Sequence, residues 1–284
     1  MAHVFPTLIH RGAMSETLSI RLARDDGLTL ERDPRTKDWF FSGNFALLSA
    51  ILVGYVYVVK VAGPRFMRHR EPMHGIKAII MAYNAVMVAF SAYFTYNIAR
   101  RSYLGGGYSP VCQGLHFDNR DRNTMELLEF LYWYMWVRLA DFLDTLFFVL
   151  RKKDSHVSVL HVTHHCLVVF TGWFGLTYGA DGHVVFCVCI NGFIHVVMYS
   201  YYFLSLLGPS VRRYLWWKKY LTQLQLLQFA AGSIHTMLPL LRDCGYPRIH
   251  TYICIAQGIF FFVMFMNFYQ KAYVKRTSQR AKAE

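Results

Sequence analysis

Seven apolar segments run along the chain, and they restrict its fold more strongly than any other feature. Several of them reach or exceed the ~20 residues with which a helix crosses a hydrocarbon core of ~30 Å. Because backbone groups in lipid need hydrogen-bond partners within the segment, such segments cross as helices, whereas a β-barrel would show short alternating segments. We therefore expect an all-α integral membrane protein with seven transmembrane helices. The segments lie at roughly residues 40–61, 76–98, 124–150, 157–177, 184–207, 215–241 and 249–273.

Basic residues are distributed unevenly between the connections of these segments. The chain carries 30 Lys and Arg against 17 Asp and Glu, a formal net charge of +13. One alternate set of connections holds 17 of the basic residues and the opposite set only 6. Because Lys and Arg accumulate on the cytoplasmic side, the bias predicts a cytosolic C-terminus and a lumenal N-terminus. The positive charge is thus explained by membrane topology, and no nucleic-acid partner is expected.

The ends of the chain differ in character from the apolar centre. We expect a polar lumenal tail over residues 1–38, one membrane domain over 39–274 and a cytosolic tail over 275–284. No charged-then-apolar signal peptide opens the chain. Its last residues, RAKAE, place Arg280 and Lys282 in a dilysine-like pattern, which is a weak signal for retention in the endoplasmic reticulum membrane.

Two of the six cysteines fall in non-cytoplasmic connections. Cys112 and Cys244 lie in the connections before the third segment and after the sixth. An oxidising lumen favours disulfides, so we expect these two to pair, with free thiols as the alternative. The other cysteines lie within the segments, where a cysteine is usually a small apolar residue.

The third segment, RLADFLDTLFFVLRKK, contains three ionisable side chains. Arg138, Asp141 and Asp144 follow one another at spacings of three, so neighbours in this series can touch on a helix. Ionisable residues within a span are functional candidates by default. An ion pair that merely holds helices together is an equally good interpretation.

Three histidines stand close together in the fourth segment, LHVTHHCLVVF. His161, His164 and His165 are spaced i, i+3 and i+4, which places them near one face. Hydrogen-bonded core histidines are one interpretation. A metal site is another, because HxxHH suits iron in membrane di-iron hydroxylases and desaturases. Only His195, His235 and, at the start of the last segment, His250 remain in the other segments, and no second such box exists. The third interpretation is acid–base or nucleophilic catalysis by imidazole.

Polar stripes continue in the fifth and sixth segments, NGFIHVVMYSYY and TQLQLLQ. Amides and hydroxyls in lipid need partners, so they either join helices or line a shared cavity. The stripes contain Asn191, His195, Tyr199, Tyr202, Gln225 and Gln228. Four successive segments with such residues favour a cavity, and a polyanionic ligand would suit the basic residues expected at its cytoplasmic mouth. These are Arg151, Lys152, Lys153, Lys218 and Lys219.

Several ordered motifs resemble those of the fatty-acid elongase (ELO) family, the elongation-of-very-long-chain-fatty-acids proteins. They are DPRTKDWF, DTLFFVLRKK, LHVTHH, NGFIHVVMYSYY and YLWWKKYLTQLQLLQ, and the resemblance covers about residues 33–275. It implies a seven-helix endoplasmic reticulum enzyme with a tunnel for the acyl tail. The implied activity is that of a very-long-chain 3-oxoacyl-CoA synthase, an acyltransferase. It condenses long-chain acyl-CoA with malonyl-CoA to 3-ketoacyl-CoA, CO2 and CoA, without a metal or other cofactor.

The resemblance also assigns roles to residues. It implies that His161, His164 and His165 form the histidine box and that His195 is a second catalytic histidine. By position we choose His164 as a nucleophile that is transiently acylated. Asn191, Tyr199, Tyr202, Gln225 and Gln228 match other polar positions of the family, while Lys152, Lys153, Lys218 and Lys219 would bind CoA. The family further implies a ketoacyl reductase, a dehydratase and an enoyl reductase as partners in the membrane.

The chain departs from the family pattern at several positions. The motif KxxExxDT is here Arg138, Asp141, Asp144 and Thr145, with a shorter carboxylate at 141. Gly172 stands where the family commonly has Trp, and Val169 adds less bulk than an aromatic residue. We expect Gly172 either to widen the tunnel or to permit close helix packing. Two rival functions remain, a di-iron hydroxylase or desaturase and a seven-helix receptor or transporter.

Overall fold

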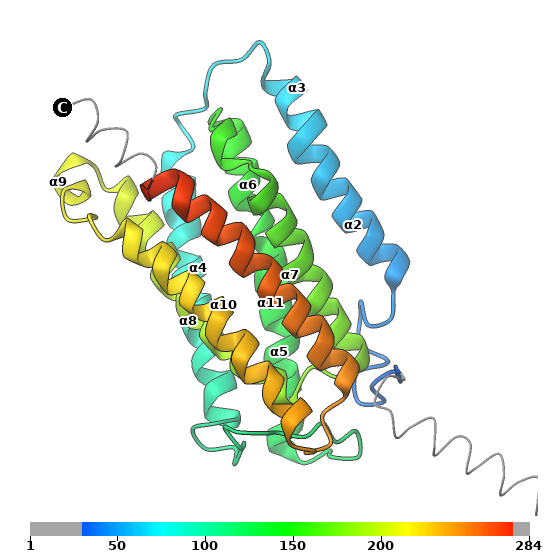
Figure 1. The fold of residues 1–284 in the computed structure, drawn as a ribbon. Coiled ribbons are helices and arrows are strands. Elements are labelled where there is room, and N and C mark those ends of the chain that lie inside the picture. Colours follow the sequence, from blue (N-terminus) through cyan, green and yellow to red (C-terminus); the bar gives the residue numbers. More distant parts are fainter. Residues whose placement is uncertain (1–29, 275–284) are drawn as a thin grey trace, which may run out of the picture.

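The computed structural model describes residues 30–274 and shows a bundle of long helices that run up and down beside one another (Figure 1). No strand occurs within this range, so the expected all-α membrane fold is confirmed. The long helices are α2 (Phe45–Tyr57), α4 (Lys77–Arg101), α5 (Arg122–Ala140), α6 (Phe142–Leu150), α7 (Val159–Tyr178), α8 (Val185–Leu206), α10 (Lys218–Leu241) and α11 (Arg248–Tyr269). Shorter elements are η1 (Val58–Ala62), α3 (Gly63–Met67), η2 (Asp154–His156), η3 (Gly182–Val184), α9 (Pro209–Arg212) and η4 (Gln270–Val274).

Six helical segments among the described residues are long and apolar enough to cross a membrane. Each of them corresponds to one of the expected spans. The third expected span is different, because residues 124–150 form α5 and α6, which are interrupted at Asp141. The sequence did not predict this interruption, and α5 and α6 are not among the six segments. Arg138, Asp141 and Asp144 surround the interruption and give this segment its polar character.

Helix α2 lies on the outer side of the bundle and continues through η1 into α3 (Figure 1). It packs against α7, while α3 packs against α6. The other helices are more closely associated: α4 packs along α8 and α5, and α10 packs along α11. Helices α5, α7, α8, α10 and α11 together surround the space in which the polar residues of the sequence meet.

The two ends of the bundle have different chemistry. The basic end carries Lys153, after α6, and Lys218, at the start of α10. The opposite end carries a disulfide between Cys112 and Cys244, whose Cα atoms are 5.9 Å apart across a sequence separation of 132. We call it the disulfide end. Because α7 begins at Val159 near the basic end and finishes at Tyr178 near the disulfide end, its histidines lie in the basic half.

A buried ion triad closes the disulfide end. The guanidinium of Arg35 donates to Asp33 and to Asp181, with a shortest distance of 2.7 Å to each carboxylate. All three side chains are excluded from solvent. The backbone of Asp33 also donates to Thr177 O at 2.9 Å. The triad thus ties the segment before α2 to the end of α7 and the start of α8.

Candidate functional site

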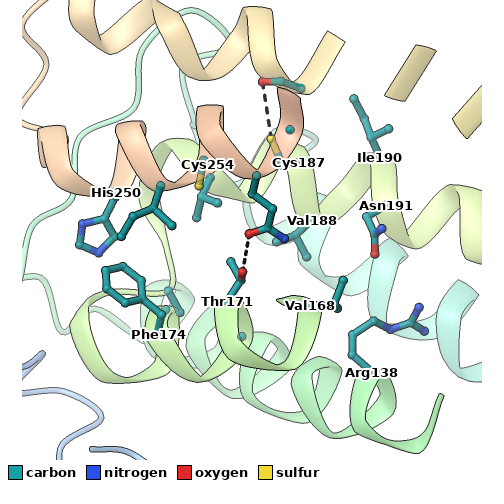
Figure 2. Close-up of a pocket in the computed structure, with 18 of the residues that line it drawn as sticks. Arg138, Val168, Thr171, Phe174, Cys187, Val188, Ile190, Asn191, His250 and Cys254 are labelled. Atoms are coloured by element: carbon teal, nitrogen blue, oxygen red, sulfur yellow. Dashed lines mark hydrogen bonds between the residues drawn. The ribbon is translucent and has the colours of Figure 1, made fainter. Parts of the chain in front are cut away.

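A central cavity of about 220 Å³ lies between α5, α7, α8, α10 and α11. Arg138, His164, Asn191 and Gln228 line its basic half, so four helices contribute the polar residues that the sequence singled out. Toward the disulfide end its lining includes Phe174 and His250. Figure 2 shows this extent, with Arg138 and Asn191 on one side of the close-up and His250 and Phe174 on the other.

The three histidines of α7 do not share one environment. His164 lines the central cavity and packs on Phe261, with ring centroids 4.9 Å apart. Its ring has no hydrogen-bond partner among residues 30–274. His161 points elsewhere, because its Nε2 lies 2.9 Å from Thr145 Oγ1 on α6. The ring of His165 packs against that of His161 at 4.3 Å and is buried.

His195 is held by the helix that carries it. Its Nδ1 lies 2.7 Å from the backbone oxygen of Asn191, one turn earlier on α8. A carbonyl oxygen only accepts, so Nδ1 carries the proton and Nε2 presents a lone pair. That Nε2 is 3.7 Å from Asp141 Oδ2. The side chain of Asn191 is fixed separately, because its Oδ1 accepts from the Tyr134 hydroxyl at 2.9 Å.

The charged residues of α5 and α6 meet at Tyr199. Arg138 Nη1 lies 3.1 Å from Asp141 Oδ2, and both side chains are buried. The Tyr199 hydroxyl lies 2.9 Å from Asp141 Oδ1 and 2.6 Å from Asp144 Oδ2. The carboxylates expected to be neighbours are therefore bridged by a residue from α8. Nε and Nη1 of Arg138 make no hydrogen bond within the described residues, and Arg138 faces the central cavity beside His164.

Among the four lysines proposed for CoA, Lys153 and Lys218 approach each other. Burial, followed by the charges of Arg151, Arg212 and Lys218, lowers the pKa of Lys153. Burial and the charges of Lys153 and Lys218 likewise lower the pKa of His156. Such mutual repulsion marks a site where an anion would be stabilised. Lys152 instead lines a separate cavity with Lys60 and Arg68, while Lys219 lies over the Tyr269 ring.

The other polar residues predicted for the site are Gln225, Gln228 and Tyr202, and they do not all line the cavity. Gln228 lines the central cavity. Gln225 contacts Met198, with Nε2 3.8 Å from the sulfur. The ring of Tyr202 packs against Tyr199 with centroids 5.9 Å apart. Gln225 and Tyr202 therefore support their neighbours and do not line the cavity.

Comparison with known proteins decides the family. Residues 40–281 match the ELO family, described as GNS1/SUR4. The chain belongs to this family. It is 41% identical over 252 residues to a very long chain fatty acid elongase of Aedes aegypti, which covers 88% of this chain and 70% of the relative. It is 39% identical to very long chain fatty acid elongase 4 of Mus musculus, with 85% of this chain and 76% of the relative covered. Rattus norvegicus elongase 7 is 37% identical, with 93% of both chains covered. The resemblance seen in the sequence is confirmed.

Gly172 lies both on the central cavity and against α5. Gly172 lines the central cavity, as one expectation had it. A Cβ at Gly172 would also lie 2.8 Å from Cγ of Met135 on α5, so the two helices approach each other closely at this position. Val169 does not line the cavity and is buried in a core cluster with Met135 and Trp173.

Several residues of the site were missed by the sequence analysis. Tyr55, in the first span, lies 2.8 Å from the Thr145 hydroxyl that contacts His161. Ser91, in the second span, accepts from Arg138 Nη2 at 3.2 Å. Hydroxyls in lipid need partners, so both could have been found by asking which polar groups in other spans satisfy the charged ones.

Proposed function

We propose that this protein is a very-long-chain 3-oxoacyl-CoA synthase, which condenses a long-chain acyl-CoA with malonyl-CoA in the first step of fatty-acid elongation. Its membership of a family whose relatives are very long chain fatty acid elongases supports the reaction class. The observation that carries the proposal is the position of His164. It alone of the three clustered histidines lines a long, mostly apolar cavity, and its ring makes no hydrogen bond to another described residue.

The first half of the reaction uses His164 as nucleophile. A neutral ring nitrogen attacks the thioester carbon, the C–S bond breaks and the acyl group is held on the imidazole. The proton displaced from the ring leaves with the CoA sulfur. Phe261 packs against the His164 ring, so the apolar side of the site excludes water that would hydrolyse the acyl-imidazole.

The second half begins when malonyl-CoA replaces CoA. Loss of CO2 leaves an enolate, whose carbon attacks the held acyl group. The C–N bond to His164 breaks and the ring takes up one proton. Arg138, whose Nε makes no hydrogen bond within the described residues and whose side chain lines the cavity, would stabilise the enolate oxygen. In the first half, His195, whose Nε2 is unprotonated, would accept the proton displaced from His164 and pass it to the departing CoA sulfur.

The same proposal includes an orientation of the protein across the membrane. The basic end would face the cytosol, where Lys153 and Lys218, whose charges repel each other, would bind the phosphates of CoA. The disulfide end and the N-terminus would face the lumen of the endoplasmic reticulum, whose oxidising conditions favour the Cys112–Cys244 bridge. The dilysine-like signal at residues 275–284 lies outside the described residues. A ketoacyl reductase, a dehydratase and an enoyl reductase would process the product.

The proposal is tested with purified protein, labelled malonyl-CoA and a panel of saturated and unsaturated acyl-CoAs. We expect labelled 3-ketoacyl-CoA, with equal amounts of CO2 and free CoA released. No product with any acyl-CoA would refute the synthase. Metal analysis on the same sample tests the di-iron rival: about two irons per chain, together with oxygen-dependent turnover of an acyl chain, would favour it.

A further inference from the structure

Three polar side chains from three helices meet part-way along the central cavity. Thr171 of α7 hydrogen-bonds to Gln257 of α11, with Oγ1 2.5 Å from Oε1 (Figure 2). Ser233 of α10 lies at the same level, because a side chain on Gly258 would collide with its hydroxyl. All three residues line the cavity. We call this set of Thr171, Ser233 and Gln257 the polar belt.

The polar belt has hydrogen-bonding capacity that the protein leaves unused. The Thr171 hydroxyl is within hydrogen-bond distance of Leu167 O and of one end of the Gln257 amide. An amide has both an oxygen and an NH2 group, and the second end of Gln257 has no partner within residues 30–274. The Ser233 hydroxyl is buried and also lacks a partner there. Unpaired polar groups in such a place are costly.

Joining helices explains only part of this arrangement. The Thr171–Gln257 contact alone would connect α7 to α11, and it needs neither Ser233 nor the free end of the amide. Apolar side chains such as Val188 and Ile253 line the cavity nearby. The polar belt therefore offers a donor and an acceptor to whatever occupies the cavity there.

We propose that the polar belt is a subsite for a hydroxyl group carried on the acyl chain, so that the substrates include mid-chain hydroxyacyl-CoAs. This inference rests on the proposed function, because it takes the central cavity as the site of the acyl tail. A hydroxyl both donates and accepts one hydrogen bond, and therefore pairs with the amide of Gln257 and the hydroxyl of Ser233 together. An unsubstituted chain satisfies neither group.

The position of the belt specifies the position of the hydroxyl. Thr171 follows His164 by seven positions, about 10 Å along α7. A carbon chain advances about 1.3 Å per bond, because C–C bonds of about 1.5 Å are inclined to its axis. With the thioester carbon at His164, the belt lies at roughly carbons 8 to 10. Val168, four positions from His164, lies at roughly carbon 5 and offers no polar group.

The test compares regioisomers of one acyl chain. The parent is the saturated acyl-CoA that the enzyme condenses fastest, and the probes are its 9-hydroxy and 5-hydroxy derivatives. We expect kcat/KM for the 9-hydroxy compound to lie within about threefold of the parent. The 5-hydroxy compound should lose about tenfold or more, because its hydroxyl does not reach the polar belt, and Gln228→Leu, which removes the cavity-lining amide on the basic side of Ser233, should deepen that loss. Gln257→Leu should lower the ratio of 9-hydroxy to parent activity by about tenfold.

Ratios measured on one preparation do not depend on the fraction of folded enzyme. Ile253→Leu, a volume-neutral change one turn away on α11, is the matched control and should leave the ratio as in the wild type. Equal rejection of both regioisomers, with the parent still condensed, overturns the subsite and leaves the synthase intact. An unchanged ratio in Gln257→Leu overturns it as well. Failure to condense any saturated parent refutes the proposed function itself.

Discussion

The phenolic oxygen of Tyr199 lies 2.6 Å from Oδ2 of Asp144. The same oxygen lies 2.9 Å from Asp141 Oδ1, and a phenol has one proton, which can be donated to only one of the two. Asp141 is paired with Arg138 and therefore keeps its charge. We therefore predict that Asp144 is protonated and donates to Tyr199 across the short contact, while Tyr199 donates to Asp141. With Asp144 neutral, the two buried carboxyl groups carry one negative charge, which the single positive charge of Arg138 balances.

Removing the hydroxyl of Tyr199 should destabilise the protein strongly, whereas replacing the carboxyl of Asp144 by an amide should destabilise it little. We expect Tyr199→Phe to lower the free energy of unfolding by about 3 kcal/mol, because two buried groups lose their partner. Asp144→Asn should cost less than about 1 kcal/mol, because its amide NH2 can replace the carboxyl proton as donor. Thermal unfolding in a mild detergent measures both. Tyr202→Phe is the matched control, because that hydroxyl makes no hydrogen bond within the described residues. Equal losses in Tyr199→Phe and Asp144→Asn would contradict the proton assignment.

The ion triad at the disulfide end should be a strong determinant of stability. Arg35→Leu leaves the carboxylates of Asp33 and Asp181 buried without their cation, and breaking such a pair costs about 3–5 kcal/mol. A large fall in the unfolding temperature is therefore expected. Arg122→Leu removes an exposed cation from Glu126 and should leave that temperature unchanged. A similar response to both variants would show that the buried triad contributes no more than a surface pair.

The Cys112–Cys244 disulfide joins the connection between α4 and α5 to the connection between α10 and α11, and so closes a long loop of the chain. In the chain-entropy model such a bridge contributes up to about 4–5 kcal/mol, and helices already held by a bilayer reduce that gain. We expect reductant to lower the unfolding temperature of the wild type. Cys112→Ala/Cys244→Ala should show the same lowered temperature without reductant and no further fall with it. An additional fall in the double variant would place the effect of reductant elsewhere.

The helices were predictable from the sequence wherever apolar character was continuous. The expected spans 157–177 and 184–207 correspond closely to α7 and α8 (Val159–Tyr178 and Val185–Leu206). Residues 124–150 were predicted as one helical span, but their interruption at Asp141 was not, because hydropathy does not report where a buried carboxylate is held by another helix. That holding residue, Tyr199, is 58 positions away.

The candidate site was predictable in composition but not in orientation. Spacing placed His161, His164 and His165 on one side of a helix, yet consecutive residues differ by about 100° around its axis. Neighbouring helices decide which of them faces a cavity. Here Thr145 on α6 contacts His161, whereas His164 lines the central cavity, to which α10 and α11 also contribute. Contacts between distant segments, such as Tyr55 with Thr145, have no local signature at all.

Filling the site of Gly172 should shorten the products. A Trp there projects between α7 and α5 and narrows the central cavity, but it first meets Met135, 2.8 Å from a Cβ at this position. We therefore expect Gly172→Trp alone to lose stability and Gly172→Trp/Met135→Ala to recover much of it. Among products, the double variant should lack the longest acyl chains made by Met135→Ala. Chromatography of the 3-ketoacyl products on an acyl-CoA panel measures this. An unchanged profile in a folded double variant would show that Gly172 serves packing alone.

The position of His164 predicts a covalent intermediate. Because its ring faces the cavity without a hydrogen-bond partner among the described residues, acyl-CoA alone should acylate it. Incubation without malonyl-CoA should release up to one equivalent of free CoA and add the acyl mass to the peptide that carries His164. His164→Ala should abolish both signals. His161→Ala should retain the acyl mass at reduced yield, since it removes only the contact to Thr145 on α6. Condensation by His164→Ala, or kinetics in which both CoA esters bind before any CoA leaves, would exclude the acyl-histidine and require direct attack of the enolate on the thioester.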